Sequence, residues 1–356
     1  MSTNGISQQK AEAFAKRMLG VLNEGALALM SSIGHRTQLF DTMAQLPPAT
    51  SGQIAEAVGL HERYVREWLS AMVVGRIVDY EPATKTYHLP AEHAAFLTRA
   101  AGADNLAFYS QYIGLFGTVE DKIVDCFFKG GGLPYTAFGR FHEIMAEDSG
   151  MNVVEPLLDT ILPLAPGLTE KLHQGIEVID VGCGRGGALM RLARAFPHSH
   201  FHGFDFSEEA ITTAQAHTEK MGLTNLHFEV KDAATWHEAN RYDLITTFDA
   251  IHDQAQPDRV LNNIFSALKP GGVYLMQDIA GSSHVHHNLD LPLGPLLYTI
   301  STMHCMSVSL AQNGDGLGTM WGKEKALELL AQAGFTHTEV HQLPHDITNY
   351  YYISRK

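Results

Sequence analysis

The chain has 356 residues, of which 45% are hydrophobic, and a formal net charge of −14, so it is long enough for two domains with a sizeable core. The negative charge argues against nucleic acid as the main partner, because contacts with phosphates require a basic surface. The polar segment 1–10, the prolines and glycines that interrupt later apolar stretches, and three widely spaced cysteines predict a cytoplasmic protein without a membrane span, disulfide framework or zinc knuckle.

Residues 1–100 have the element spacing of a winged helix. We expect a long helix over 26–46, followed by a helix-turn-helix pair over 50–58 and 62–74. Two short strands should follow, over 76–80 and 87–89. In the second helix of the pair, Arg63 and Arg66 alternate with Glu62 and Glu67, which leaves little net positive charge for a phosphate backbone. DNA binding is therefore unlikely for this domain, and a ligand-sensing DNA-binding regulator remains the alternative function.

Residues 101–168 are rich in aromatic side chains and glycine, and we expect helices there that cover a pocket. The segment Gly130-Gly131-Gly132 predicts a flexible loop. Candidate substrate contacts are the residues with a polar tip on an aromatic ring, namely Tyr109, Tyr112, Tyr135 and His142. The alternative is that most of these rings form a packed helical core.

The run 178–187 reads as a buried strand that ends in a carboxylate and continues into a glycine loop and a helix. Such a loop binds a nucleotide-bearing cofactor, with Gly182, Cys183, Gly184 and Gly186 as candidate contacts. Asp180 would repel the pyrophosphate of a dinucleotide but attract the ammonium and sulfonium of S-adenosyl-L-methionine. The charge therefore favours the sulfonium cofactor, and a nicotinamide oxidoreductase is a third, weaker possibility.

Two later strands also end in acids. Asp205-Phe206 follows the second strand and suits the ribose hydroxyls, while Asp232-Ala233 follows the third and suits the adenine ring. Phe248-Asp249, after the fourth strand, completes the candidate cofactor contacts.

In these motifs, together with 242–245 and Leu268-Lys269-Pro270-Gly271-Gly272, residues 169–356 resemble class I S-adenosylmethionine-dependent methyltransferases. The resemblance implies an α/β fold with a doubly wound Rossmann-like sheet whose last strand, near 349–353, is antiparallel. With the winged helix included, the whole chain resembles small-molecule O-methyltransferases. That implies a small-molecule acceptor and a homodimer formed through the N-terminal helices, for which 19–40 supplies an apolar face; this face alternatively packs its own domain.

Two histidines are candidate catalytic residues. His252-Asp253 follows the fourth strand and matches the His-Asp pair of such O-methyltransferases, which implies that His252 removes the acceptor's proton; the alternative is that it only shapes the pocket. His304 lies in an insertion, 280–320, that we interpret as a substrate lid with Tyr298 as a further contact. No ligand spacing in the histidine-rich 284–287 indicates a metal. The acceptor atom, oxygen by preference or nitrogen or sulfur, stays open.

Overall fold

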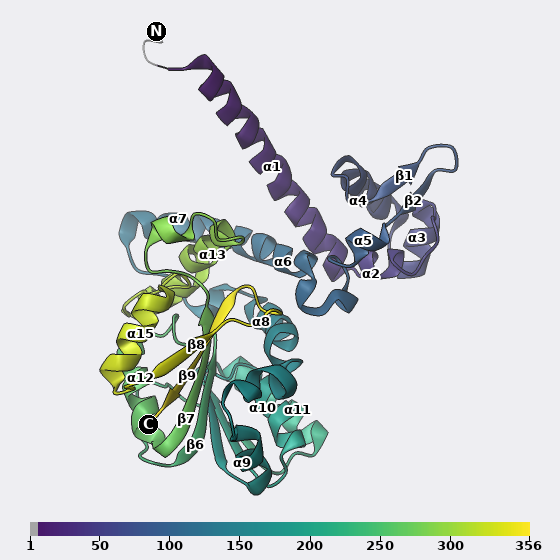
Figure 1. The fold of residues 1–356 in the computed structure, drawn as a ribbon. Helices are drawn as coiled ribbons and strands as arrows, with labels where there is room; N and C mark the ends of the chain where they lie inside the picture. Colours follow the sequence, from purple (N-terminus) through teal and green to yellow (C-terminus); the bar gives the residue numbers. More distant parts are fainter. Residues whose placement is uncertain (1–5) are drawn as a thin grey trace. The chain divides into compact units, whose positions relative to one another are not determined.

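A computed structural model describes residues 6–356 of the chain, which forms two compact units, Met1–Gly117 and Thr118–Lys356 (Figure 1). Among the described residues, no helix combines the length and apolarity that crossing a membrane requires. The sequence predicted the first domain boundary near residue 100. The compact N-terminal unit also includes α6 (Leu106–Gly117), which packs along the first helix, α1 (Gln8–Arg36), and the domain boundaries stay predictions.

The N-terminal unit begins with a helix longer and earlier than the predicted 26–46. Helix α1 ends at Arg36, and Gln38, with φ 60°, separates it from α2 (Leu39–Met43). A left-handed residue cannot continue an α-helix, so the chain turns there. Close packing fixes this turn, because a side chain at Gly34 would meet ring atoms of Phe40 and Trp68 at 2.6 Å.

The winged helix follows the predicted order of elements. A capping box from Thr50 starts α3 (Ser51–Val58), and α4 (Glu62–Val74) buries Trp68 and Leu69 against it. The wing is a hairpin of β1 (Asp79–Glu81) and β2 (Thr86–His88). After α5 (Ala91–Ala94), the 3₁₀ segment η1 (Arg99–Asp104) leads into α6.

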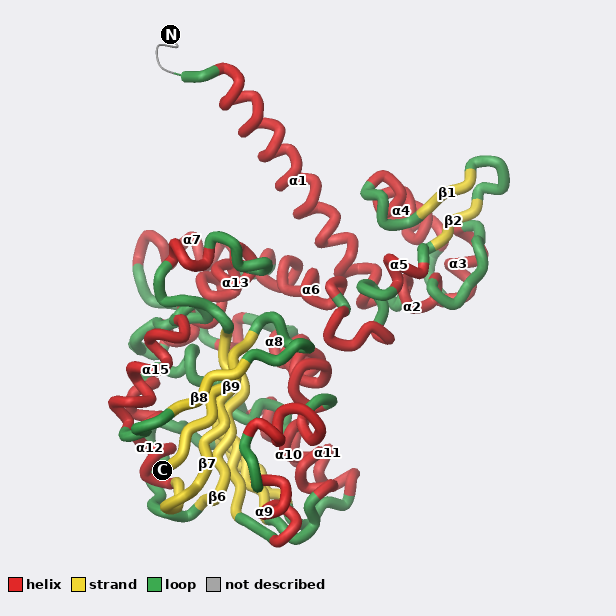
Figure 2. The backbone as a smooth tube through the Cα atoms, viewed as in Figure 1, coloured by secondary structure: helices red, strands yellow, loops and turns green. Residues whose placement is uncertain are grey.

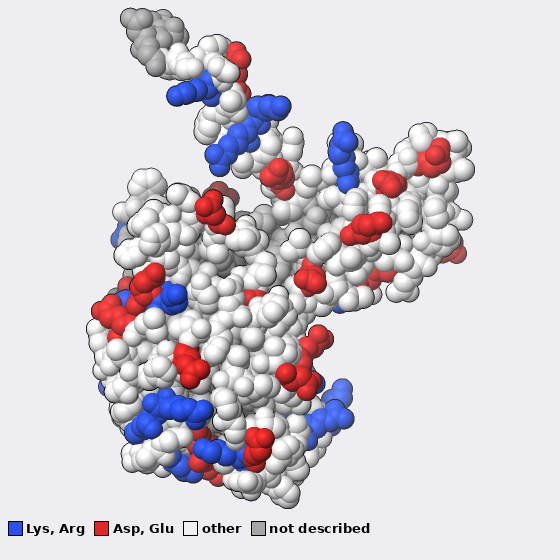
Figure 3. All heavy atoms as spheres, viewed as in Figure 1, with Lys and Arg blue, Asp and Glu red and all other residues white. Residues whose placement is uncertain are grey.

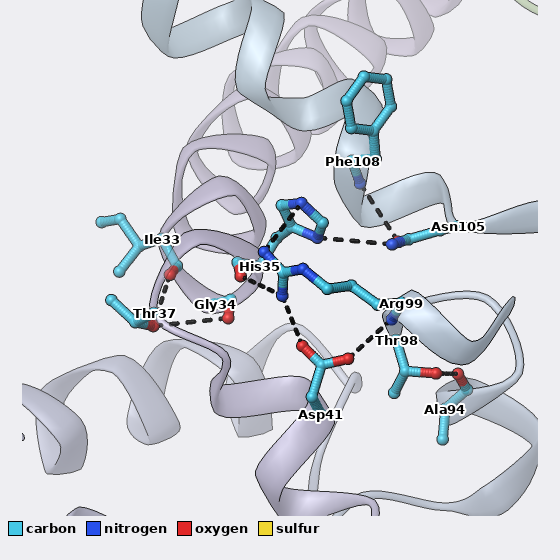
Figure 4. Close-up of polar contacts among 10 residues, drawn as sticks. All are labelled: Ile33, Gly34, His35, Thr37, Asp41, Ala94, Thr98, Arg99, Asn105 and Phe108. Atoms are coloured by element: carbon cyan, nitrogen blue, oxygen red, sulfur yellow. Dashed lines mark hydrogen bonds and ion pairs between the residues drawn. The ribbon is translucent and has the colours of Figure 1, made fainter. Parts of the chain in front are cut away.

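A polar cluster joins the end of α1 to this winged helix (Figure 4). Arg99 donates from Nη1 to Asp41 Oδ2 at 2.7 Å and to the carbonyl of His35 at 2.9 Å, while its backbone N–H donates to Asp41 Oδ1. His35 is fully buried, and Asn105 Nδ2 lies 3.5 Å from its Nδ1. The cluster therefore satisfies polar groups where three segments of the unit meet.

The second unit is built on a seven-stranded sheet in the order β5-β4-β3-β6-β7-β9-β8. The strands are β3 (Glu177–Val181), β4 (His200–Asp205), β5 (Leu226–Val230), β6 (Tyr242–Phe248), β7 (Leu268–Ile279), β8 (Thr338–His341) and β9 (Asn349–Arg355). Strands β3 to β7 are parallel, whereas β9 pairs antiparallel with β7. The predicted Rossmann-like sheet with an antiparallel last strand is thus confirmed.

Helices cover both faces of the sheet (Figure 2). One core joins it to α9 (Leu168–Gln174), α10 (Gly187–Ala195) and α11 (Glu208–Met221), and the other to α12 (Pro257–Ala267) and α15 (Gly322–Ala333). Two further groups of helical segments belong to this unit. Before the sheet come α7 (Glu120–Lys129), η2 (Tyr135–Ala137), α8 (Phe141–Ser149), η3 (Gly150–Val154), η4 (Leu157–Ile161) and η5 (Leu162–Leu164); the insertion after β7 forms η6 (Val285–Asn288), α13 (Gly294–Ile300), η7 (Ser301–Cys305) and α14 (Met306–Ala311).

Candidate functional site

Asp180 lies near the carboxyl end of the central strand β3 and is almost completely buried, with 3% of its surface exposed. Thr246 on β6 donates to its Oδ1 at 2.7 Å. Burial raises the pKa of Asp180 to about 7, partly opposed by this hydrogen bond, and nearby Asp205 adds to the rise. Burying a carboxylate without a counter-charge destabilises its ionised form, so Asp180 suits a ligand that is positively charged or donates hydrogen bonds.

The loop after β3 needs glycine for two physical reasons. Gly182, Gly184 and Gly186 all have positive φ, between 52° and 75°, which strains other L-residues. In addition, a side chain at Gly186 would collide with the ring of Phe228 on β5, so this glycine lets α10 approach the sheet. At Gly184 a side chain would meet no heavy atom within 4 Å, and the backbone there is open to a ligand.

Asp205, at the end of β4, lies beside that loop. Its Oδ2 accepts from the Gly184 N–H at 3.0 Å and its Oδ1 from the Ser207 N–H at 2.8 Å. Each oxygen retains a lone pair that suits a ribose hydroxyl. Burial raises the pKa of Asp205, opposed by those backbone donors. Burial, and after it the charge of Asp205, raises the pKa of the Cys183 thiol. Beyond β5, Asp232 Oδ1 accepts from the Ala234 N–H.

His252 forms a buried dyad with Asp278, a residue that the sequence did not single out. Its Nδ1 donates to Asp278 Oδ1 at 2.8 Å, and Trp321 Nε1 donates to the same oxygen at 2.8 Å. On the opposite edge of the ring, Nε2 lies 3.3 Å from Cys305 Sγ. Burial lowers the pKa of His252, but Asp278 and then Cys305 outweigh it and raise this pKa well above its usual value. The carboxylate thus orients the ring and stabilises its protonated form.

Asp253, the next residue, accepts a hydrogen bond from the Tyr135 hydroxyl. Burial raises the pKa of Asp253 to about 6, opposed by His252 and by this bond, and burial also raises the pKa of Tyr135 well above its usual value. The Tyr135 ring stacks on His142 and meets Phe206 edge-on at 4.9 Å. The predicted loop therefore brings Tyr135 and His142 to the carboxyl edge, beside Asp205-Phe206.

His304 joins this cluster from the lid insertion. Its ring stacks on Phe141 with centroids 3.5 Å apart and faces the edge of Tyr135. Burial and the nearby charge of His252 lower the pKa of His304 well below its usual value, so the ring is neutral. Its Nε2 is buried without a hydrogen-bond partner, and its Nδ1 lies 3.6 Å from Cys305 Sγ.

The remaining candidate substrate residues are Tyr109, Tyr112 and Tyr298. Tyr109 and Tyr112 belong to α6 of the N-terminal unit, where both contact the ring of Phe108 edge-on. Tyr298 lies in the lid insertion and accepts a hydrogen bond from Asn288 at 3.0 Å. Their roles in substrate binding stay predictions.

A metal could be held by Asp249, His252 and Asp278, each of which has a ligand atom within 4.8 Å of the others. However, His252 Nδ1 and Asp278 Oδ1 already bond to each other, so the geometry fits a hydrogen-bonded dyad better than a metal centre. Sequence reasoning missed Asp278, Cys305 and Trp321, and the available signal was that Asp278 is one more acid near the end of a parallel strand.

Two models of known protein families match the chain, one in each of its two units. The model of the Rv2258c-like winged HTH domain matches residues 25–99, and a methyltransferase domain model matches residues 172–334. The ubiquinone biosynthesis O-methyltransferase of Coxiella burnetii is 34% identical over 100 residues, which are 28% of this chain and 42% of that protein. The trans-aconitate 2-methyltransferase of Variovorax paradoxus is 33% identical over 30% of this chain and 39% of its own. The chain thus spans about two fifths of the curated relatives it matches.

Solved structures resemble the chain over nearly its whole length. A putative O-methyltransferase from Nostoc punctiforme has a TM-score of 0.71 at 17% identity and covers 96% of this chain and 98% of its own. Human N-acetylserotonin methyltransferase in complex with SAM has a TM-score of 0.68 at 18% identity, and the match covers 100% of this chain and 99% of that one. The mitomycin 7-O-methyltransferase MmcR has a TM-score of 0.69 at 16% identity, and the match covers 98% of this chain and 100% of that one. At these identities the likeness concerns the fold.

Proposed function

We propose that this chain, which joins a winged helix-turn-helix domain to a methyltransferase domain, transfers a methyl group from S-adenosyl-L-methionine to a small organic acceptor. The proposal is supported by one observation: the carboxyl edge of the sheet, which suits a nucleoside cofactor, lies beside the His252–Asp278 dyad. Asp180, the glycine loop and Asp205 lie at the carboxyl ends of β3 and β4. His252 follows the neighbouring strand β6, and its partner Asp278 lies at the carboxyl end of β7. Ligands of open α/β sheets bind at this edge.

The residues fit the cofactor in charge and in shape. Asp180 faces the positively charged methionine end, Gly182 to Gly186 pass close to the ligand, and Asp205 accepts from the ribose hydroxyls. Asp232 and the backbone of Ala233 contact the adenine ring in this proposal, and Phe206 covers it. When bound, the cofactor supplies a methyl group on a sulfonium, which is a good leaving group.

The chain's own contribution to the transfer is then to position the acceptor and to take its proton. When its ring is neutral, His252 accepts a hydroxyl proton at Nε2, and Asp278 stabilises the resulting imidazolium through Nδ1. Because this dyad serves a hydroxyl best, we favour O-methylation over N- or S-methylation. Tyr135, His142 and His304 border the space beside the base, and the loop 130–138 excludes water from it. His304, neutral and with a buried unpartnered Nε2, holds the acceptor or serves as a second base.

For the N-terminal unit we propose dimerisation. Along α1 the large apolar side chains of Phe14, Leu19 and Leu22 are 61%, 64% and 72% exposed, an unusual surface for a helix without a partner chain. DNA binding has less support, because Arg63 and Arg66 on α4 form ion pairs with Glu67 and Glu62. The face of the winged helix seen in Figure 3 carries no continuous basic stripe. The three free cysteines accord with a cytoplasmic location, which we retain as a proposal.

The test is titration calorimetry with S-adenosylhomocysteine, followed by an acceptor screen that detects release of this product from S-adenosylmethionine. We expect micromolar or tighter binding by the wild-type chain and a loss of about 10- to 100-fold in an Asp205→Ala variant, since hydrogen bonds to a charged group are removed. Unchanged affinity in that variant would refute the assignment of Asp205. NADH that binds in place of S-adenosylhomocysteine would overturn the function.

A further inference from the structure

Three exposed histidines gather at the start of the lid insertion. The rings of His284, His286 and His287 all contact one another, with centroids 4.1, 5.6 and 5.8 Å apart. Spacing alone did not indicate a metal here, but the segment folds as the 3₁₀ turn η6, which the His287 N–H closes by donating to the His284 carbonyl at 2.9 Å. Side chains three residues apart lie one above the other in such a turn, so His284 and His287 share a face.

The turn that carries these rings is held in one conformation by its neighbours. Asn288 is buried; its Oδ1 accepts from the Ser282 N–H at 2.9 Å, and its Nδ2 donates to the Ser282 carbonyl at 2.8 Å. The Ser283 hydroxyl donates to the Trp321 carbonyl at 2.7 Å, next to the first residue of α15. A ligand that binds to the rings therefore has little backbone to order.

A chain of hydrogen bonds determines which nitrogen of His287 carries the proton. The Ser282 hydroxyl donates to Glu324 Oε1 at 2.9 Å, and a carboxylate only accepts. Ser282 Oγ has no second proton, so it accepts from His287 Nδ1, which lies 3.3 Å away. The ring proton is then on Nδ1, and Nε2 keeps the lone pair with which imidazole binds a metal. A carboxylate that acts on a ligand histidine in this way is common around metal sites.

The separation of the three rings matches that of imidazoles bound to one metal ion. With Zn–N bonds of about 2.0–2.1 Å, two imidazoles on a tetrahedral ion have ring centres about 5 Å apart. The centroids here are 4.1 to 5.8 Å apart. Their nitrogens are not yet directed at one point, since among the described residues only Asp249, His252 and Asp278 have ligand atoms within 4.8 Å of one another. Rotation of the exposed rings about their Cβ–Cγ bonds is the movement that the site requires.

We propose that His284, His286 and His287 form a surface site for a divalent transition metal ion such as Zn²⁺ or Ni²⁺, with water completing the coordination. Imidazole nitrogen suits these ions, whereas Mg²⁺ and Ca²⁺ prefer oxygen ligands. None of the three histidines is assigned to the cofactor or the acceptor, so the inference is independent of the proposed function.

The test is calorimetric titration of zinc chloride into the untagged chain and four variants. His284→Ala and His286→Ala each remove one ligand, while Ser282→Ala keeps all three rings and removes the hydrogen bond to His287. The matched control is His217→Ala, at an exposed histidine of α11. Thermal melting checks each fold, and these exposed histidines leave no cavity when they are truncated.

We expect wild type and His217→Ala to bind Zn²⁺ equally well, with a dissociation constant that is micromolar or lower. His284→Ala and His286→Ala should each weaken this binding by about 100-fold or more, and Ser282→Ala by about 10- to 100-fold, the range for residues that orient a ligand. An excess of Mg²⁺ should not compete. Equal zinc affinity in wild type, His284→Ala and His286→Ala, or an equal loss in His217→Ala, would overturn the proposed site.

Discussion

Replacing Asp180 by asparagine should make the protein more resistant to rising pH while it weakens cofactor binding. The side chain is 3% exposed, and its pKa is raised from 3.8 to about 7. Because the folded state holds this proton where the unfolded chain releases it, the free energy of unfolding falls as pH rises from about 4 to about 7 and is level above that range.

The size of the effect follows from the shift. Between pH 5 and the pKa of about 7 the wild-type chain loses about 1.4 kcal/mol per pH unit from this group, or roughly 3 kcal/mol. Asparagine does not titrate, and its side-chain oxygen still accepts from Thr246. Other groups titrate alike in both proteins, so the difference between variant and wild type should change by roughly 3 kcal/mol between pH 5 and pH 8 in favour of the variant.

The assay is urea denaturation of both proteins at pH 5 and pH 8, with calorimetric titration of S-adenosylhomocysteine at pH 8. The affinity of Asp180→Asn should drop about 10- to 100-fold, since a charged acceptor is lost. Asp243→Asn is a matched control at the opposite end of β6, where Asp243 pairs with Lys269; it should leave cofactor affinity unchanged. A stability difference independent of pH, together with unaltered affinity for Asp180→Asn, would refute the electrostatic reasoning.

Two further variants test the base and the dimer. Asp278→Asn removes the largest influence that raises the pKa of His252, so the pH at which turnover is half-maximal should move to a lower value; an unshifted profile would show that Asp278 does not act through His252. His252→Ala should lower kcat at pH 7 by about 100-fold or more, and full turnover across a pH series would remove its role as base. Leu22→Glu, at a side chain 72% exposed on α1, should halve the mass seen by light scattering without lowering Tm, and a monomeric wild type would contradict the proposed dimer.

The sequence was sufficient wherever the determinants are local. The loop from Gly182 to Gly186 and the acids at strand ends were predicted because each depends on neighbours a few positions away. The N-terminal helix was predicted too short, since its start depends on the Ser7 cap and its end on Gln38 in a left-handed conformation. Neither residue interrupts the apolar spacing that was used to delimit the helix.

Partners distant in sequence were the part that pattern reasoning could not supply. Asp278 and Cys305 contact His252, and Trp321 contacts Asp278, only because of the order of strands β6 and β7 and the path of the lid insertion.

The acidity of the carboxyl edge explains why a phosphate-free cation is the ligand that these residues suit. Asp180, Asp205, Asp249 and Asp253 all have raised pKa values, with burial as the first cause in each case. A pyrophosphate would add negative charge beside carboxyl groups whose ionisation burial already disfavours, whereas an ammonium and a sulfonium would supply the counter-charge that favours their ionised form. Cofactor binding and ionisation of this edge are therefore coupled, and each of the aspartate variants above probes one side of that coupling.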